Sequence, residues 1–282
     1  MIEKMMKNYK LLIVIPVIVT IIMLGVILTN GLEQGVELKG GSIANLELTK
    51  NMSSTELKNT LSNKLNSSSV DVLSKVDSKV SVEIGNEVNE TVFTDVVGDT
   101  GKIISYSSIG PVLSAEAMVQ IYWAIAFAFI FMSITVFIIF REFVPSIAII
   151  LAAVSDIVVA IGGMSIFHID LSIASVGAIL MLIGYSVDSD ILLTTRLLRR
   201  KEGTVSQRAL NAMKTGITMS FAAIVAMAVL YIVTIVLIPE ASTLSDIAIV
   251  LIFGLLGDIT ATWLMNLGII RWYLGDKGAD NL

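Results

Sequence analysis

Residues 171–200 read LSIASVGAILMLIGYSVDSDILLTTRLLRR, and this stretch predicts what kind of protein the chain is. About 20 predominantly apolar residues form an α-helix long enough to cross the roughly 30 Å hydrocarbon core of a bilayer. The stretch nevertheless contains Asp188 and Asp190, and a carboxylate inside a membrane is energetically unfavourable and is usually kept for function. The arginines at its end mark the cytoplasmic side, where basic residues accumulate. We therefore expect a membrane-crossing helix that carries a buried acid.

The composition of the whole chain supports an integral membrane protein. Of its 282 residues, 55% are hydrophobic and 15% are charged, with a mean hydropathy of +0.85. A soluble domain of this length could not bury so much apolar surface. The chain has no cysteine, which excludes disulfides and thiolate metal sites, and its one histidine, His168, argues against a histidine-based metal site. We expect no metal and no cofactor.

Six apolar runs predict six transmembrane helices. The fourth lies in the stretch quoted above and follows a turn at His168. The other five cover Leu11–Leu28, Val119–Phe140, Val144–Phe167, Ile217–Ile238 and Asp246–Trp272. We interpret the first as a retained helix, because its apolar core is longer than that of a signal peptide and no cleavage site follows it. Residues 201–214 are expected to form a basic loop.

The distribution of lysine and arginine predicts how these helices are oriented. All basic residues outside the region 31–117 fall at the ends and in the loops that we assign to the cytoplasm, and the two short loops assigned to the exterior carry none. The basic residues on the cytoplasmic side are Lys4, Lys7, Lys10, Arg141, Arg196, Arg199, Arg200, Lys201, Arg208, Lys214, Arg271 and Lys277. Basic loops stay inside, so both termini are predicted to be cytoplasmic.

Residues 31–117 differ from the rest and predict an extracytoplasmic domain between the first two helices. They contain 12 Asp and Glu against 7 Lys, a local charge of −5 that equals the net charge of the whole chain. Alternating patterns predict strands at Ser42–Leu48, Val70–Val76, Val80–Ile84 and Lys102–Ser107. Helices are expected from the Ser53/Glu56 capping-box pattern to about Asn66, and at Asn89–Val97. The predicted organisation is therefore residues 1–30 with the first helix, 31–117 as a small α+β domain and 118–282 with the remaining five helices.

Four aspartates fall inside the predicted spans. Asp156 is on the third helix, Asp188 and Asp190 are on the fourth, and Asp258 is on the sixth. At about 1.5 Å per residue, Asp156 and Asp258 are each about 18 Å from the start of their helix, near the middle of the membrane. The functional interpretation is that these carboxylates take up and release protons or other cations. The alternative is that they form polar contacts that only hold the helices together.

Helical phase separates the two acids of the fourth helix. Two residues are about 200° apart, so Asp188 and Asp190 cannot share a face. Asp188 lies on one stripe with Gly177 and Gly184, small residues that allow another helix to approach closely, so we predict that Asp188 is the buried acid. Lys214, which opens the fifth helix, could pair with a helix-4 acid, although snorkelling to the interface is the simpler interpretation. The glycines expected to serve close helix packing are Gly162, Gly163, Gly254 and Gly257.

Several segments resemble motifs of the SecF family of protein-export membrane proteins. They are KGGS at 39–42, SSIGPVLSAE at 107–116, GYSVDSD at 184–190 and NLGIIRWYL at 266–274. The motif positions are Gly40, Gly41, Gly110, Pro111, Gly184 and Tyr185. The resemblance covers essentially the whole chain in order, with the same six-helix layout. It is closest to the archaeal branch of the family.

This resemblance implies one half of a SecD–SecF assembly with an architecture similar to that of resistance-nodulation-division transporters. Such a subunit pairs with SecD, assists the Sec channel in moving exported polypeptides and draws on a proton or cation gradient. Its exterior domain would be ferredoxin-like. The chain departs from the family pattern at Ser189, where bacterial members usually carry the acid, and at Lys214, where they carry arginine. Coupling through Asp188 and Lys214 is therefore a hypothesis that the resemblance does not carry over directly.

Other interpretations of the sequence are an enzyme or an independent transporter. An intramembrane aspartyl protease needs a G-x-G-D motif, whereas Gly254 to Asp258 has the wrong spacing. A stand-alone small-molecule exporter of the resistance-nodulation-division type usually carries two six-helix halves in one chain, and no duplication is present here. No G-x-x-x-x-G-K-[ST] loop occurs, so a gradient rather than ATP would supply energy. We expect neither enzymatic activity nor a nucleic-acid partner.

Overall fold

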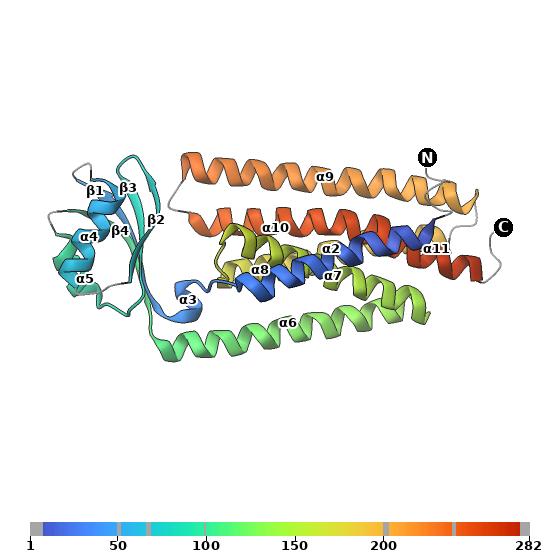
Figure 1. Cartoon of the computed structure of the whole chain (residues 1–282), viewed down its shortest axis with the longest axis horizontal. Coiled ribbons are helices and arrows are strands. Elements are labelled where there is room, and N and C mark those ends of the chain that lie inside the picture. Colours follow the sequence, from blue (N-terminus) through green and yellow to red (C-terminus); the bar gives the residue numbers. More distant parts are fainter. Residues whose placement is uncertain are drawn as a thin grey trace.

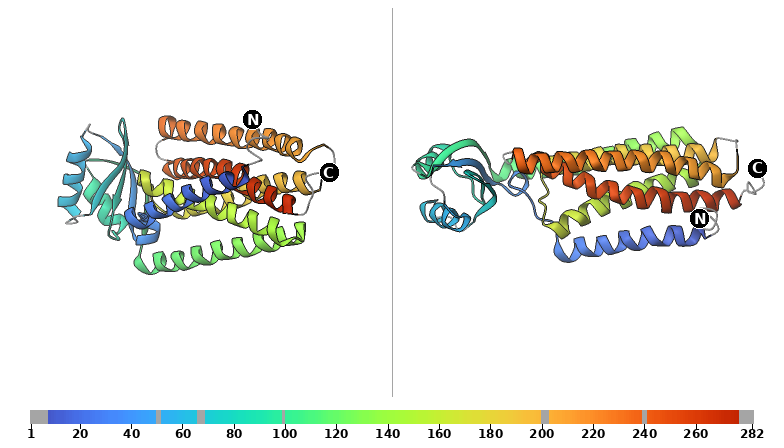
Figure 2. Two further views of the ribbon diagram at one scale, coloured as in Figure 1. Left: turned by 45° about the vertical axis from the view of Figure 1, so that its right-hand side comes forward. Right: turned by 90° about the horizontal axis from the view of Figure 1, so that it is seen from above.

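The structure is a computed structural model that describes residues 8–49, 52–65, 69–98, 100–199, 203–238 and 241–276. A small unit of strands and short helices lies at one end of a bundle of long helices, which run along the long axis of the molecule (Figure 1). The first long helix, α2 (Tyr9–Asn30), starts at the opposite end of the bundle, and the last helix, α11 (Leu267–Asp276), ends there (Figures 1 and 2).

In the part of the chain that the structure describes, six helices are long and apolar enough to cross a membrane, which confirms the predicted six-helix architecture. The first is α2, and the last consists of three consecutive elements that end with α11. The four spans in between are α6 (Pro111–Phe140), α7 (Phe143–Phe167), α8 (Ile173–Leu198) and α9 (Val205–Leu237). The last span consists of α10 (Ser242–Thr260), the π-helical segment η1 (Ala261–Asn266) and α11. The last span is thus an α-helix interrupted by wider turns after its midpoint.

The fifth helix begins earlier than the sequence analysis predicted. The expected basic loop at 201–214 is wrong from Val205 onward, because α9 already starts there. Thr204 accepts a hydrogen bond from the backbone of Gln207, and the Gln207 side chain accepts one from the backbone of Thr204. This capping box is a helix start signal that lies outside the apolar run, so hydropathy alone does not reveal it.

Two other helices also extend beyond their apolar runs. α6 starts at Pro111 rather than Val119, with Gly110 in front of it and the proline at the first helical position, where no backbone N–H is needed. Its first turns therefore lie inside the range 31–117 that was assigned to the exterior domain. α10 starts at Ser242, ahead of the predicted Asp246.

The small unit contains a four-stranded sheet with two helices on it. Its elements, after the short helix α3 (Val36–Lys39), are β1 (Gly41–Leu48), α4 (Ser54–Leu65), β2 (Val70–Val76), β3 (Lys79–Ile84), α5 (Glu90–Val97) and β4 (Gly101–Ile109). The strands are antiparallel in the order β2-β3-β1-β4. Their inward side chains and those of α4 and α5 form one core: Ala44, Leu46, Leu57, Leu61, Val82 and Phe93. The order βαββαβ is the one expected for a ferredoxin-like fold, and that classification stays a prediction.

The capping box predicted at the start of α4 is confirmed. The Ser53 hydroxyl accepts a hydrogen bond from the backbone N–H of Glu56, and the Glu56 carboxylate accepts one from the backbone N–H of Ser53. The predicted helix end at Asn66 lies outside the described residues. Asn89 caps α5 by accepting a hydrogen bond from the backbone of Thr91.

The helix bundle has a centre and a periphery. In α7, α8 and the last span, 56% of the most apolar window is buried, against 11–17% in α2, α6 and α9. Glycines bring the central helices together: a Cβ on Gly254 of α10 would lie 2.2 Å from Leu182 Cδ2, and one on Gly163 of α7 would lie 2.5 Å from Phe253 Cγ. The prediction that these glycines serve close packing is confirmed, since no larger residue fits there without a shift.

The segment between α2 and the sheet packs on the turn between α7 and α8. The backbone N–H of Gly35 donates to Leu171 O (2.9 Å), and the N–H of Leu171 donates to Glu33 O (2.8 Å). The Glu37 carboxylate accepts a hydrogen bond from the backbone N–H of Ile173 (2.8 Å), the first residue of α8. A side chain of α3 therefore supplies one of the partners that the start of α8 needs.

Charged side chains surround this junction. Lys39 and Glu83 form an ion pair of 2.5 Å between α3 and β3. Burial raises the pKa of Asp170, in the α7–α8 turn, and repulsion from Glu83 adds to the increase. The small unit and the membrane helices thus meet through both backbone and side-chain contacts.

The natural absence of cysteine makes this junction testable by crosslinking. A Cβ on Gly35 would lie 3.7 Å from the Cβ of Asp170, and Cβ atoms in a disulfide are about 3.8 Å apart. We expect Gly35→Cys/Asp170→Cys to form a disulfide on mild oxidation in native membranes, which protects both thiols from a maleimide reagent until reductant is added. Each single-cysteine variant should stay reactive throughout. Two reactive thiols in the oxidised double variant would contradict the packing of this segment on the turn.

Candidate functional site

Three carboxylates from three different helices meet inside the bundle. Asp156 of α7, Asp190 of α8 and Asp258 of α10 each have no exposed surface. They are close enough for Asp258 and Asp190 both to repel Asp156 electrostatically. We call these three residues the acid cluster. It brings together three of the four intramembrane acids that the sequence analysis selected.

The acid cluster is held by hydroxyl and amide groups. Ser186 donates to Asp156 Oδ2, and Asn266 Nδ2 donates to Asp190 Oδ1 at 2.7 Å. Asp258 accepts hydrogen bonds from two hydroxyls, Thr262 Oγ1 at 3.0 Å and Ser220 Oγ of α9 at 3.2 Å. Among the described residues, the contacts found for these carboxylates include no lysine or arginine.

The prediction that Asp188 is the buried acid of the fourth helix is wrong. Asp188 is exposed on the outside of α8, and Asp190 is the acid that points into the bundle. Gly177 and Gly184, which share the Asp188 stripe, are exposed too, and a Cβ on either would meet nothing within 4 Å. The close helix approach expected on this stripe is therefore not seen within the described residues.

Lys214 does not complete the site. It is exposed, and within the described part of the chain no hydrogen bond or ion pair joins its amine to an acid. Its position near the start of α9 fits the simpler interpretation, in which a long basic side chain reaches the membrane surface. The structure therefore does not bring Asp188 and Lys214 together with the acid cluster.

The sequence analysis missed the polar side chains that surround the cluster. Thr262 and Asn266 belong to η1, and Ser186 and Ser220 look like ordinary small residues in apolar helices. A usable signal was present: Ser186 and Asp190 are four residues apart on α8, which places them on one face. Asn266 was assigned only to a family motif, although an amide in an apolar run also requires a partner.

Two oxygen atoms of the acid cluster, Asp156 Oδ1 and Asp190 Oδ2, have no described hydrogen-bond partner. The same holds for Asn266 Oδ1, beside Asp190, and for Thr194 Oγ1, four residues after Asp190 on α8. Buried polar atoms normally find a partner, so an unpaired set marks a place where a proton, a water molecule or a cation can bind. Within the described residues, no three His, Cys, Asp or Glu side chains are arranged to hold a metal ion together. Buried carboxylates as a class can exchange a proton or another cation.

The family-motif positions fall at junctions of the fold. Gly40 and Gly41 have φ angles of 82° and 140°, which favour glycine, and they turn the chain from α3 into β1. A Cβ on Gly41 would lie 2.5 Å from Ile84 O. Gly110 and Pro111 start α6, whereas Gly184 lies on the exposed face of α8 and Tyr185, next to it, is close to Asp258. The first four positions therefore set junctions of the fold, while a Cβ added to Gly184 meets nothing within 4 Å.

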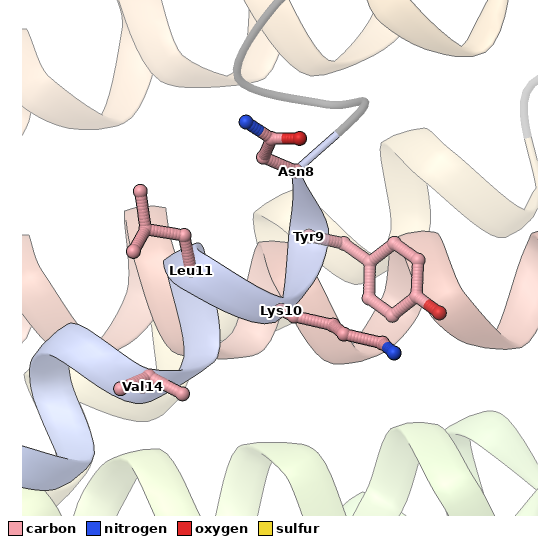
Figure 3. Close-up of a pocket in the computed structure, with 5 residues that line it drawn as sticks. All are labelled: Asn8, Tyr9, Lys10, Leu11 and Val14. Atoms are coloured by element: carbon pink, nitrogen blue, oxygen red, sulfur yellow. The ribbon is translucent and has the colours of Figure 1, made fainter.

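A separate pocket of about 420 Å³ lies at the start of α2. Its lining side chains, from Asn8 to Val14, are drawn in Figure 3, where Tyr9 and Lys10 point to one side of the helix and Leu11 to the other. This mixture of an amine, a phenol and apolar groups is typical of the membrane–water interface. The pocket contains none of the acid-cluster residues and is not part of that site.

Comparison with known proteins gives a consistent result. Residues 88–276 match the family model described as protein export membrane protein SecD/SecF, C-terminal. The chain is 57% identical to protein-export membrane protein SecF of Methanothermobacter thermautotrophicus, over 97% of this chain and 96% of that protein. It is 39% identical to SecF of Methanocaldococcus jannaschii over 99% of this chain and all of that protein.

A solved structure has the same fold. The crystal structure of SecDF, a translocon-associated membrane protein from Thermus thermophilus, superposes with a TM-score of 0.79 over 95% of this chain, at 16% identity. This chain covers 38% of that longer one. At this identity the likeness concerns the fold alone.

The packing of η1 against α9 predicts that alanine destabilises the protein at Gly216 but not at Gly184. A Cβ on Gly216 would lie 2.0 Å from Cζ2 of the buried Trp263 ring, whereas one on Gly184 meets nothing within 4 Å. We expect Gly216→Ala to lower the free energy of unfolding of the purified protein by about 1–3 kcal/mol, the usual cost of an overpacked core, and hence to lower its unfolding temperature. Gly184→Ala, the matched control, should leave the unfolding temperature unchanged. Equal unfolding temperatures for both variants would contradict the contact.

Proposed function

The chain belongs to the SecF family of protein-export membrane proteins, and on that basis we propose how its buried acids serve export. It is a multi-pass membrane protein and an accessory subunit of the Sec protein-export machinery. We propose that it draws on a gradient of protons or other singly charged cations, which exchange on the acid cluster. Family membership favours this role over the independent exporter and the protease considered from the sequence.

The observation that carries this proposal is the meeting of three carboxylates on three central helices. In a bilayer, an acid without a basic partner is stable only when it is neutral, solvated or bound to a cation. Loading and unloading of a cation changes the mutual repulsion of Asp156, Asp190 and Asp258, and hence the preferred packing of α7, α8 and α10. Such a change is the physical link that a gradient-driven subunit requires.

The topology predicted from the basic residues gives the direction of flow. We propose that the α+β unit is extracytoplasmic and that both termini are cytoplasmic, because the described basic residues outside residues 31–117 belong to the helix ends away from the sheet. They are Lys10, Arg141, Arg196, Arg199, Arg208, Lys214 and Arg271. The cation would then enter from the side of the α+β unit and leave toward Arg196, which anchors α8 to Asn211 O (2.6 Å) on α9.

The outer face of α8 supports a partner subunit. Five of its residues at three- or four-residue spacing are exposed: Ile173, Gly177, Met181, Gly184 and Asp188. A carboxylate that faces lipid is unfavourable, and small residues such as these two glycines suit close contact with another helix. We propose that this face packs against SecD, and that the pair acts together with the Sec channel on exported polypeptides.

Substitution of each of the two acids of α8 by asparagine tests which of them is the coupling site. We expect Asp190→Asn to reduce the stimulation of export by an imposed ion gradient by about tenfold or more, because the amide cannot take up a cation by exchange. Asp188→Asn should retain this stimulation, measured per copy of SecD–SecF complex in membrane vesicles. Thr234→Val, which removes a buried hydroxyl far along α9, serves as the control for packing. If Asp188→Asn loses the stimulation and Asp190→Asn retains it, the coupling residue is Asp188 and not Asp190.

Bulky substitutions on the outer face of α8 test the partner contact. We expect Gly184→Leu to lower the amount of SecD that co-purifies with tagged protein in mild detergent by about fivefold or more, because it overpacks the proposed interface. Gly25→Leu is the matched control, since Gly25 of α2 likewise has nothing within 4 Å of an added Cβ. Recovery of SecD at the normal ratio with Gly184→Leu would contradict this contact.

A further inference from the structure

We infer that Asn266 is the residue that positions Asp190, and that the π-helical segment η1 delivers it. The inference rests on the proposed role of Asp190 in gradient coupling. Asn266 and Asp190 lie 76 positions apart in the chain, both are fully buried, and the Asn266 amide donates to Asp190 Oδ1 at 2.7 Å. Thr262 also lies beside Asp190, but its hydroxyl donates to Asp258 Oδ1, so Asp190 Oδ2 is left without a described hydrogen-bond partner.

The π-helical geometry explains why Asn266 reaches Asp190. An α-helix turns by about 100° per residue, so Asn266, eight positions after Asp258, would otherwise stand about 80° around the helix from it. A π-helix has more residues per turn, because its hydrogen bonds run from i to i+5, and this offsets the drift. Asp258, Thr262 and Asn266 consequently serve the same cluster, Thr262 by its bond to Asp258 Oδ1 (3.0 Å) and Asn266 by its bond to Asp190.

The segment is held in this form by its own packing. Between Thr262 and Asn266, the buried Trp263 ring fills the space over Gly216 of α9. π-helical turns are less favourable than α-helical ones and are frequent at functional sites. The Trp263 contact therefore helps to hold the wide turn that presents the amide to Asp190.

The unpaired atoms around this bond point to positioning rather than packing. Asp190 Oδ2, Asn266 Oδ1 and Thr194 Oγ1 have no described hydrogen-bond partner. A contact that served only to hold helices together would satisfy both ends of the amide and both carboxylate oxygens. Here one bond orients the carboxylate and leaves Oδ2 as the atom that exchanges the cation.

The test uses full-length protein in its complex with SecD and measures gradient-stimulated export in vesicles, per copy of complex. We expect Asn266→Leu to reduce the stimulation about tenfold, the scale of one charge-assisted hydrogen bond. In the background of Asp190→Asn, the same substitution should cause no further loss, because it acts only through Asp190. An additional loss of similar size in the double variant would overturn the inference.

Asn266→Asp provides a conservative variant with a distinctive readout. It has nearly the same shape as asparagine, but its carboxyl donates a hydrogen bond only while it is protonated. Its gradient-stimulated export, expressed as a fraction of the wild-type value at the same pH, should be high at acidic pH and low at alkaline pH. The same fraction should stay low at every pH for Asn266→Leu. The wild-type reference accounts for the other titratable groups that face the cluster, Asp156, Asp258 and Tyr185. Activity of Asn266→Asp that is independent of pH would overturn the inference.

These outcomes separate the inference from the function on which it rests. If Asp190→Asn leaves the stimulation intact, the proposed coupling role of Asp190 fails. If Asp190→Asn abolishes the stimulation and Asn266→Leu does not reduce it, only the positioning role of Asn266 fails. The unfolding temperature of each variant, compared with that of the Thr234→Val control, shows whether a loss reflects damage to the fold.

Discussion

The structure depends on one physical constraint: carboxylates in the middle of a bilayer must find their polar partners inside the protein. Asp156, Asp190 and Asp258 would each be unfavourable against lipid, and together they also repel one another. They can be accommodated only where several helices converge and carry small hydroxyl or amide groups. The helices that bear them, α7, α8 and α10, are accordingly the central ones, while α2, α6 and α9 form the periphery. The polar requirement thus decides which helices are buried in a chain where almost every helix is apolar.

Convergence of three helices also requires that their backbones approach closely. Gly257, next to Asp258, allows α10 to lie against α7, since a Cβ there would be 3.3 Å from the Asp156 Cα. Gly216 does the same for α9, whose Ser220 reaches Asp258 one turn further along. Without hydrophobic driving force between helices in lipid, such contacts of small residues supply much of the packing energy. The glycines and the acids are therefore parts of one arrangement: the glycines set the distance that the hydroxyls need to reach the carboxylates.

Much of this could be predicted from the sequence, and the rest depends on contacts that a sequence does not express. Hydropathy and the placement of basic residues located six spans, and the rarity of acids in apolar runs selected Asp156, Asp190 and Asp258. Helical phase showed that Asp188 and Asp190 face opposite ways, but it could not decide which face is covered by this chain. The small residues beside Asp188 favoured close approach of another helix, and yet no described residue lies within 4 Å of a Cβ added to Gly177 or Gly184. The π-helical turn at Ala261–Asn266, whose Trp263 packs over Gly216 of α9, was not predicted, because a uniform α-helical period was expected for the whole span.

The position of α8 explains why changes at the acid cluster can reach the rest of the molecule. At one end, the backbone of Ile173 is capped by Glu37, which belongs to the segment leading into the sheet. At the other end, Arg196 holds α8 to the start of α9. Asp190 lies between these two attachments on a continuous helix, and a helix moves as a rigid body over such a length more readily than it bends. A shift of α8 that follows a change of charge at Asp190 would therefore displace the Glu37 contact as well, and this contact connects α8 to the segment that leads into the α+β unit.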